Sequence, residues 1–247
     1  MEKAFRALLL KLIGHKNYLL LVSGIYIRLI KASMLKQRYP ELFYLKQLIK
    51  PGFVCVDIGA NVGYYSTFLS TFTGANGHVY AVEPVDLFAG VFKKNAATFA
   101  LNNITLYQTA LGGEKRTITM GTPIIEGVFR HGLTKIVDEQ EQGNLHTYEV
   151  PMQIPDELFA GLSRFDFLKC DVEGYEVFIM PHFIQTLSRF KPVIQMEISS
   201  ESNRNAIFNL LAPLGYRIFA LKNNELAPLT PQEALVYESG DFYFKHP

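Results

Sequence analysis

The chain has 247 residues, of which 49% are hydrophobic and 13% aromatic, and its formal net charge is +1. This apolar content excludes a disordered chain, and the length suits one α/β domain with additions. The near-zero net charge argues against binding of nucleic acid by overall electrostatic attraction. The two cysteines, Cys55 and Cys170, lie in apolar runs without metal-ligand spacing, so we expect buried, reduced thiols and a cytoplasmic protein.

Residues 1–50 form a basic segment in which apolar residues recur at helical spacing, which predicts an N-terminal extension of two or three helices. The segment holds ten of the 24 Lys/Arg residues but two of the 23 acids, so the remaining chain is acidic. This asymmetry suits peripheral contact with an anionic membrane surface, and it equally suits a solvated helix face. Its apolar stretches are too short to cross a bilayer, and no signal-peptide cleavage site follows them.

A continuous apolar run, Phe53–Ile58, ends in a glycine-punctuated turn and is followed by residues at helical spacing. This arrangement is typical of cofactor sites, because glycines let the backbone approach a ligand and the helix start offers unpaired N–H groups. A dinucleotide fingerprint needs glycines at its first, third and sixth positions, which are Gly59, Asn61 and Tyr64 here. The acid Asp57 would repel a pyrophosphate but suits the cationic groups of S-adenosylmethionine (SAM).

The turn Asp57-x-Gly59-x-Asn61-x-Gly63, within VDIGANVGYYS, resembles the glycine motif of the FkbM family of class I SAM-dependent methyltransferases. The resemblance implies that Gly59, Asn61 and Gly63 shape the pocket for the amino-acid end of SAM, and that Asp57 faces its ammonium group. It also implies an α/β fold of the Rossmann-like class I type. We therefore expect a mostly parallel seven-stranded sheet with helices on both faces and the last strand antiparallel. The methyltransferase domain would span residues 51–247.

Three further residues are candidates for the cofactor site. The apolar run HVYAVE ends at Glu83. Its separation from Gly59 in the sequence fits that of the acid that binds ribose hydroxyls in Rossmann-like sites. The alternating run Ile104–Ala110 predicts the third strand. In the class I fold the loop after that strand lies near the adenine, so the resemblance implicates Thr109 and Ala110.

The next stretch, ALGGEKRTITM, resembles a hairpin of the FkbM family, with Gly112 and Gly113 in its turn. Residues 121–153 are the least regular part of the chain. Long irregular stretches in compact domains are often functional, so we interpret this one as an insertion on the acceptor side. His131 is its candidate acid or base, although a lone histidine in a loop is also often simply solvated.

The run FDFLKCD predicts the fourth strand, and in an extended strand end the side chains of Lys169, Asp171 and Glu173 share one face. Charged side chains on a buried strand cost free energy unless they are paired or serve a function. DFLKCDVEGYE resembles the second FkbM signature, which implies a catalytic or methionine-contacting role. The catalytic candidates are Asp171, His131, Lys169 and Glu173, and the alternative is a purely structural Lys169–Asp171 pair. Asp171, Glu173 and Glu197 are instead the candidate ligands of an Mg²⁺ ion that would lower the pKa of the acceptor.

The acceptor predicted from the sequence is a hydroxyl group. The chain lacks the Asn/Asp-Pro-Pro-aromatic turn of enzymes that methylate base nitrogens, and Cys170 does not follow proline as in cytosine-C5 enzymes, so no nucleic acid is expected. The resemblance implies O-methylation of a sugar, a glycan or a related polyhydroxylated molecule, whose hydroxyls carboxylates can bind. Two alternatives stay open: an NAD-type Rossmann oxidoreductase, and a non-catalytic protein that binds SAM or a membrane surface.

Overall fold

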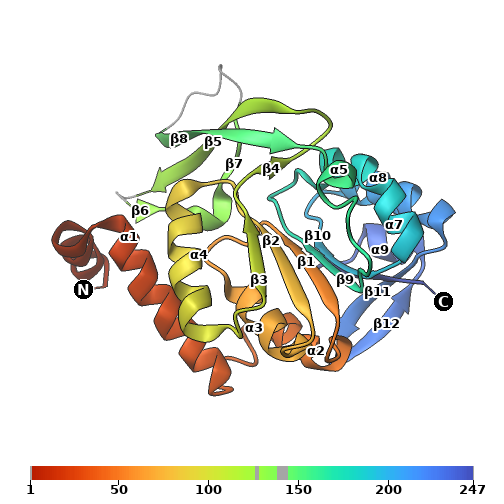
Figure 1. Ribbon diagram of the computed structural model, residues 1–247, viewed down its shortest axis with the longest axis horizontal. Coiled ribbons are helices and arrows are strands. Elements are labelled where there is room, and N and C mark those ends of the chain that lie inside the picture. The colour runs from red at the N-terminus through yellow and green to blue at the C-terminus, as the bar shows by residue number, and fades with distance from the viewer. Residues whose placement is uncertain (1, 126–127, 138–143, 247) are drawn as a thin grey trace.

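The computed structural model describes residues 2–125, 128–137 and 144–246. Its centre is an eight-stranded sheet with the order β12-β11-β13-β10-β9-β1-β2-β3 (Figure 1). The strands are β1 (Val54–Ile58), β2 (His78–Val82), β3 (Ile104–Tyr107), β9 (Phe167–Cys170), β10 (Val193–Glu197), β11 (Arg217–Lys222), β12 (Glu225–Leu229) and β13 (Asp241–Lys245).

The sheet has the predicted Rossmann-like organisation. Strands β3, β2, β1, β9 and β10 are parallel, and β13 lies antiparallel between β10 and β11. The predicted number of seven strands is wrong, because β12 adds an eighth at the edge. Strands β11 and β12 form a hairpin through Asn223 and Asn224, whose φ values are +51° and +63°. Asparagine tolerates this left-handed conformation, which a two-residue hairpin turn requires.

Helices cover both faces of the sheet, as predicted. Neighbouring positions of β1 show this: Cys55 belongs to a core cluster with residues of α1, α2 and α3, whereas Val56 belongs to another with residues of α6, α7, α8 and α9. The helices are α1 (Glu2–Lys31), α2 (Pro40–Leu48), α3 (Tyr64–Thr73), α4 (Asp86–Phe99), α5 (Pro155–Leu158), α6 (Glu176–Ile179), α7 (Ile184–Phe190), α8 (Glu201–Leu211) and α9 (Pro231–Leu235), with short 3₁₀ turns η1 (His131–Leu133), η2 (Met180–His182) and η3 (Ala212–Leu214).

The predicted helical extension consists of α1 and α2. Helix α1 is kinked at Gly14, whose φ of +72° and ψ of +165° are not helical. Its second part packs against α4, and its first part projects beyond the body of the molecule (Figure 1). None of the described helices is long and apolar enough to span a bilayer.

The stretch predicted to be an irregular insertion is largely a second sheet, which lies above the first in Figure 1. Long strands β5 (Arg116–Ile125) and β8 (Leu145–Gln153) pair antiparallel, from Arg116 opposite Met152 to Pro123 opposite Leu145. The short strands are β4 (Ala110–Leu111), β6 (Val128–Phe129) and β7 (Lys135–Ile136). The predicted hairpin at Gly112 and Gly113 is wrong, because β8 lies between β4 and β5 and pairs with both.

Candidate active site

A cavity at the carboxyl ends of β1, β2 and β9 brings together most of the predicted site residues. Because these strands are parallel, the turns that follow them meet at one edge of the sheet. Gly63 and Glu197 are the two predicted residues that lie outside the cavity lining. The predicted residues that line it are Asp57, Gly59, Asn61, Glu83, Thr109, Ala110, His131, Lys169, Asp171 and Glu173.

The glycine turn after β1 has the tight geometry expected of a ligand cradle. Gly59, Asn61 and Gly63 all have left-handed φ values, of +82°, +50° and +91°. A Cβ atom on Gly59 would lie 1.9 Å from the carbonyl oxygen of Asp171, so only glycine fits between the turns after β1 and β9. Gly63 starts α3, and a Cβ atom there would lie 3.0 Å from the ring of Phe92. Its role is therefore in packing the turn against α4.

The carboxylate of Glu83 ties the end of β2 to the glycine turn. Its Oε2 atom accepts the backbone N–H of Asn61 at 2.9 Å, and its Oε1 atom accepts that of Val85 at 2.9 Å. Glu83 is 5% exposed, and this burial raises its pKa to about 7, against the opposing effect of the two N–H donors. Each oxygen keeps a second lone pair with which it can accept a ribose hydroxyl.

The raised pKa of Glu83 predicts a characteristic dependence of stability on pH. The folded state holds a proton on Glu83 up to about pH 7, whereas the unfolded chain releases it near the ordinary pKa of 4.5. The free energy of unfolding should therefore fall as the pH rises from about 4.5 through about 7. Glu83→Gln has no carboxyl group at this position to titrate. The thermal midpoint of this variant should therefore decline less between pH 4.5 and pH 7 than that of the wild type. Glu201→Gln, at an exposed helix start, is the control and should follow the wild type.

Asp57 is buried at the end of β1 and is oriented by a residue that the sequence analysis missed. Its Oδ2 atom accepts the hydroxyl of Ser66, from the first turn of α3, at 2.5 Å. Burial raises the pKa of Asp57 to about 6, although the Ser66 hydroxyl and the nearby Lys169 ammonium favour its charged form. A cationic ligand in the cavity would favour that form further.

His131, from the short turn η1 that links β6 and β7 of the second sheet, contacts the glycine turn. Its Nδ1 atom lies 3.0 Å from Oδ1 of Asn61, and its backbone carbonyl accepts Nδ2 of Asn61 at 3.2 Å. Since an amide oxygen only accepts, Nδ1 carries the hydrogen and Nε2 keeps its lone pair. Burial lowers the pKa of His131, so its imidazole is neutral at neutral pH and Nε2 is able to accept a proton.

This contact predicts a measurable effect of His131→Ala on the cofactor. Losing the imidazole removes one of the two contacts that fix the Asn61 side chain, and it should weaken SAM binding by about tenfold, which corresponds to the loss of roughly one hydrogen bond. Leu133→Ala, on the same short turn, removes a side chain that is 48% exposed and is the control. Calorimetric titration with SAM would compare the two variants, and equal dissociation constants would contradict the assigned contact.

Thr109 and Ala110 line the cavity where β3 passes into β4, but the Thr109 hydroxyl is engaged within the protein. It donates to the carbonyl oxygens of Pro151 at 2.9 Å and of Ala110 at 3.0 Å. Thr109 therefore fixes the second sheet to the first at the cavity wall. Any contact of these two residues with a ligand would come from their remaining atoms, since the hydroxyl proton is not free.

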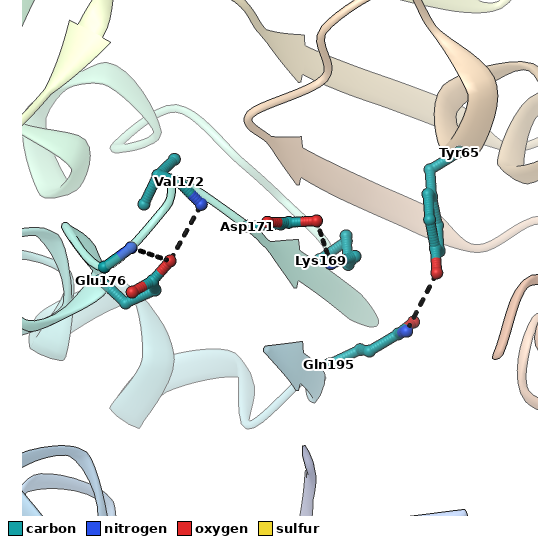
Figure 2. A network of polar contacts seen from close by, with 7 residues as sticks. Tyr65, Lys169, Asp171, Val172, Glu176 and Gln195 are labelled. Atoms are coloured by element: carbon teal, nitrogen blue, oxygen red, sulfur yellow. Dashed lines mark hydrogen bonds and ion pairs between the residues drawn. The ribbon is translucent and has the colours of Figure 1, made fainter. Parts of the chain in front are cut away.

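Lys169 and Asp171 form an ion pair at the end of β9, as Figure 2 shows. The Nζ atom of Lys169 lies 3.0 Å from Oδ2 of Asp171 and 5.0 Å from the centre of the Tyr65 ring. Burial by itself lowers the pKa of Lys169, but the charge of Asp171 and the neighbouring Tyr65 and Asp241 raise it above its ordinary value. The Lys169 side chain is 2% exposed, whereas that of Asp171 is 33% exposed and faces the cavity.

Glu176 is a second residue that the sequence analysis missed, and it shapes the turn after β9 (Figure 2). Its Oε1 atom accepts the backbone N–H groups of Val172 at 2.9 Å and Gly174 at 3.4 Å. These bonds hold Glu173 and Gly174 in left-handed conformations, with φ values of +55° and +92°. The predicted common face of Lys169, Asp171 and Glu173 is therefore not formed by an extended strand, since β9 ends at Cys170.

The predicted Mg²⁺ site is not supported. Within the described residues, no group of three His, Cys, Asp or Glu side chains has the arrangement of a metal site. Asp171 is paired with Lys169, and Glu197 lies outside the cavity lining. Burial, followed by the negative charges of Asp171 and Glu197, raises the pKa of Glu173 to about 7. These carboxylates are thus close enough to repel one another without converging on one point.

Comparisons with known proteins agree with this geometry. A fold search found similarity to a candidate rRNA methylase from Clostridium thermocellum, with a TM-score of 0.51 and 10% identity over 84% of this chain and 94% of that one. It also found methyltransferase FkbM from Methylobacillus flagellatus, with a TM-score of 0.49 and 16% identity over 82% of this chain and 50% of that one. At these identities the first match shows the class I fold alone. No curated protein sequence matched.

A sequence profile of the family described as "Methyltransferase FkbM domain" matches residues 57–218, which is more than half of the chain. The match begins at Asp57 and includes both the glycine turn and the end of β9, where the cavity lies. None of these matches favours the oxidoreductase alternative, and the failed dinucleotide fingerprint also argues against it. The chain therefore belongs to the FkbM family of SAM-dependent methyltransferases.

Proposed function

We propose that the protein transfers the methyl group of SAM to a hydroxyl group of a sugar, a glycan or a related polyhydroxylated molecule. The observation that supports this most directly is the position of Asp171. Its carboxylate faces the same cavity as Asp57 and Glu83, and a buried ammonium group holds it in place. A fixed carboxylate beside a cofactor cradle suits a reaction in which a hydroxyl must be oriented and lose its proton.

The cofactor half of the cavity fits SAM in its shape and its charge. Gly59 lets the backbone approach a ligand that a Cβ atom would exclude. Asp57 is a buried carboxylate for the α-ammonium group, and Glu83 has free lone pairs for the ribose hydroxyls. SAM supplies a methyl group that its sulfonium has already activated, so the enzyme's main contribution is positioning.

The acceptor half of the cavity contains two groups that can take up a proton. Asp171 is the proposed general base, because its carboxylate is oriented by Lys169 at 3.0 Å. His131, whose Nε2 lone pair is free of the Asn61 contact, is the second candidate. Lys169 acts in either case as a positioning residue, since it is buried and its ammonium group holds the Asp171 carboxylate in place.

The cofactor assignment is tested by calorimetric titration with SAM, its demethylated product and NAD⁺. We expect SAM and its product to bind and NAD⁺ not to bind, and we expect Glu83→Ala to weaken SAM binding. Preference for NAD⁺ would overturn the proposal. Transfer is then measured with methyl-labelled SAM and panels of monosaccharides, oligosaccharides and glycolipids. A panel of RNA serves as the competing acceptor, and transfer to RNA alone would overturn the hydroxylated-carbohydrate assignment.

A further inference from the structure

The side of α1 that faces away from the core carries apolar side chains that no residue described in the structure covers. Leu21 and Ile25 are each 46% exposed, and Leu12, before the kink, is 71% exposed. Leu21 and Ile25 are spaced at i and i+4, so they lie on one side of the helix. We call this pair of residues (Leu21 and Ile25) the outer face of α1. Met34, in the turn after the helix, is 69% exposed and extends it.

The extension that carries the outer face of α1 is strongly basic. The extension holds ten Lys/Arg residues and two acids, while the rest of the chain has more acids than bases. The extension is therefore a positive part of an otherwise acidic protein. The exposed basic side chains described in α1 and in the turn after it are Lys11, Lys16, Arg28, Lys31, Lys36 and Arg38, of which Arg28 and Lys31 lie over the ring of Phe99.

The combination of apolar and basic side chains indicates which anionic partner fits. A nucleic acid would pair with the charges but leave Leu21 and Ile25 in water. An anionic bilayer satisfies both, because its phosphates attract the basic residues and its acyl boundary takes up the apolar ones. Since no described helix is long and apolar enough to cross a bilayer, the helix would lie in the interface plane.

We propose that the outer face of α1 docks the protein on an anionic membrane surface. The opposite side of the same helix reaches the active site, because Ile30 lines the cavity together with Tyr39 and Leu42 of the extension. A helix with its side chains is about 10 Å across, so docking would place the cavity wall that these three residues form close to the headgroups. Resting on the proposed function, this further assigns a membrane-borne acceptor, such as a glycolipid, to the site.

The test is flotation of the full chain with vesicles of phosphatidylcholine alone and of phosphatidylcholine mixed with phosphatidylglycerol. We expect binding to the mixed vesicles that weakens at high salt, since the Debye length shrinks from about 10 Å at 0.1 M to about 3 Å at 1 M. The double variant Leu21→Glu/Ile25→Glu should reduce this binding by about tenfold or more, because it adds charge to the inserted face.

The matched control is Ile125→Glu/Val236→Glu, which also adds two acids at exposed apolar positions, 44% and 78% exposed, on other elements. It should bind vesicles within a few-fold of the wild type. Equal losses in both double variants, or no binding of the wild type, would overturn the proposal. So would tight binding to duplex DNA that Leu21→Glu/Ile25→Glu leaves unchanged. SAM titration of each variant reports folding and tests the proposed function separately from docking.

Discussion

Asp171→Asn is expected to lower the rate of methyl transfer by about 10²- to 10⁴-fold, the range typical of losing a general base. Asparagine keeps an oxygen that can accept the Lys169 ammonium at the end of β9, so the buried cation does not lose every partner. It cannot take up a proton from the acceptor, however. We therefore expect the loss in kcat, with the dissociation constant for SAM little changed. Single-turnover transfer and SAM titration on the same preparation would measure both.

Asp166→Asn provides the matched control for this variant. Asp166 precedes β9 at the opposite edge of the sheet, where its carboxylate is also paired with a cation, Arg164, at 2.7 Å. It additionally accepts the backbone N–H of Val54, so its loss affects stability rather than the cavity. If Asp171→Asn and Asp166→Asn retained transfer to the same extent, Asp171 would not be the base, and His131 would be the remaining candidate.

Gly59→Ala should abolish measurable SAM binding and lower the thermal midpoint. The added Cβ atom would lie 1.9 Å from the carbonyl oxygen of Asp171, which is impossible without moving the turn after β1 or the turn after β9. Both turns line the cavity, so either displacement disrupts it. The left-handed φ of +82° adds strain, for which a non-glycine residue pays about 1 kcal/mol or more.

Gly52→Ala separates the effect of the steric clash from that of the backbone strain. Gly52 has nearly the same φ, +83°, but a Cβ atom there would meet no atom within 4 Å. It should therefore show the backbone strain alone, with a modest loss of stability and unchanged SAM binding. Near-wild-type binding by Gly59→Ala would mean that the turns after β1 and β9 are not held together as the structure describes them.

The strand–turn–helix unit at the cofactor site could be predicted because its signals are local. Asp57 lies at the end of β1, Gly59 and Glu83 directly follow β1 and β2, and parallel strands bring their ends together. Other parts depend on contacts between distant residues. His131 meets Asn61 across 70 positions of the chain, and no spacing rule reports such a contact. The role of Ser66 likewise appears only when the first turn of α3 lies beside Asp57.

The second sheet was not predicted because its pairing is not sequential and its strands contain misleading residues. Gly121 and Pro123 lie within β5 and read as loop signals, although the strand continues through them to Ile125. The pair of glycines at 112 and 113 reads as a hairpin turn, but β4 and β5 are separated by β8. At the other edge, the Asn223-Asn224 turn carries a clear hairpin signal, and β12 was nonetheless missed.

The position of β13 imposes an order on how the chain acquires its structure. Strands β11 and β12 come earlier in the sequence, yet they reach the parallel half of the sheet only through β13, which lies between β10 and β11. Their hairpin can form locally during synthesis, but it has no neighbour to join until residues 241–245 emerge. Until then the edges of β10 and β11 that pair with β13 lack their hydrogen-bonding partner. Completion of this half of the sheet is therefore a late, long-range event in folding.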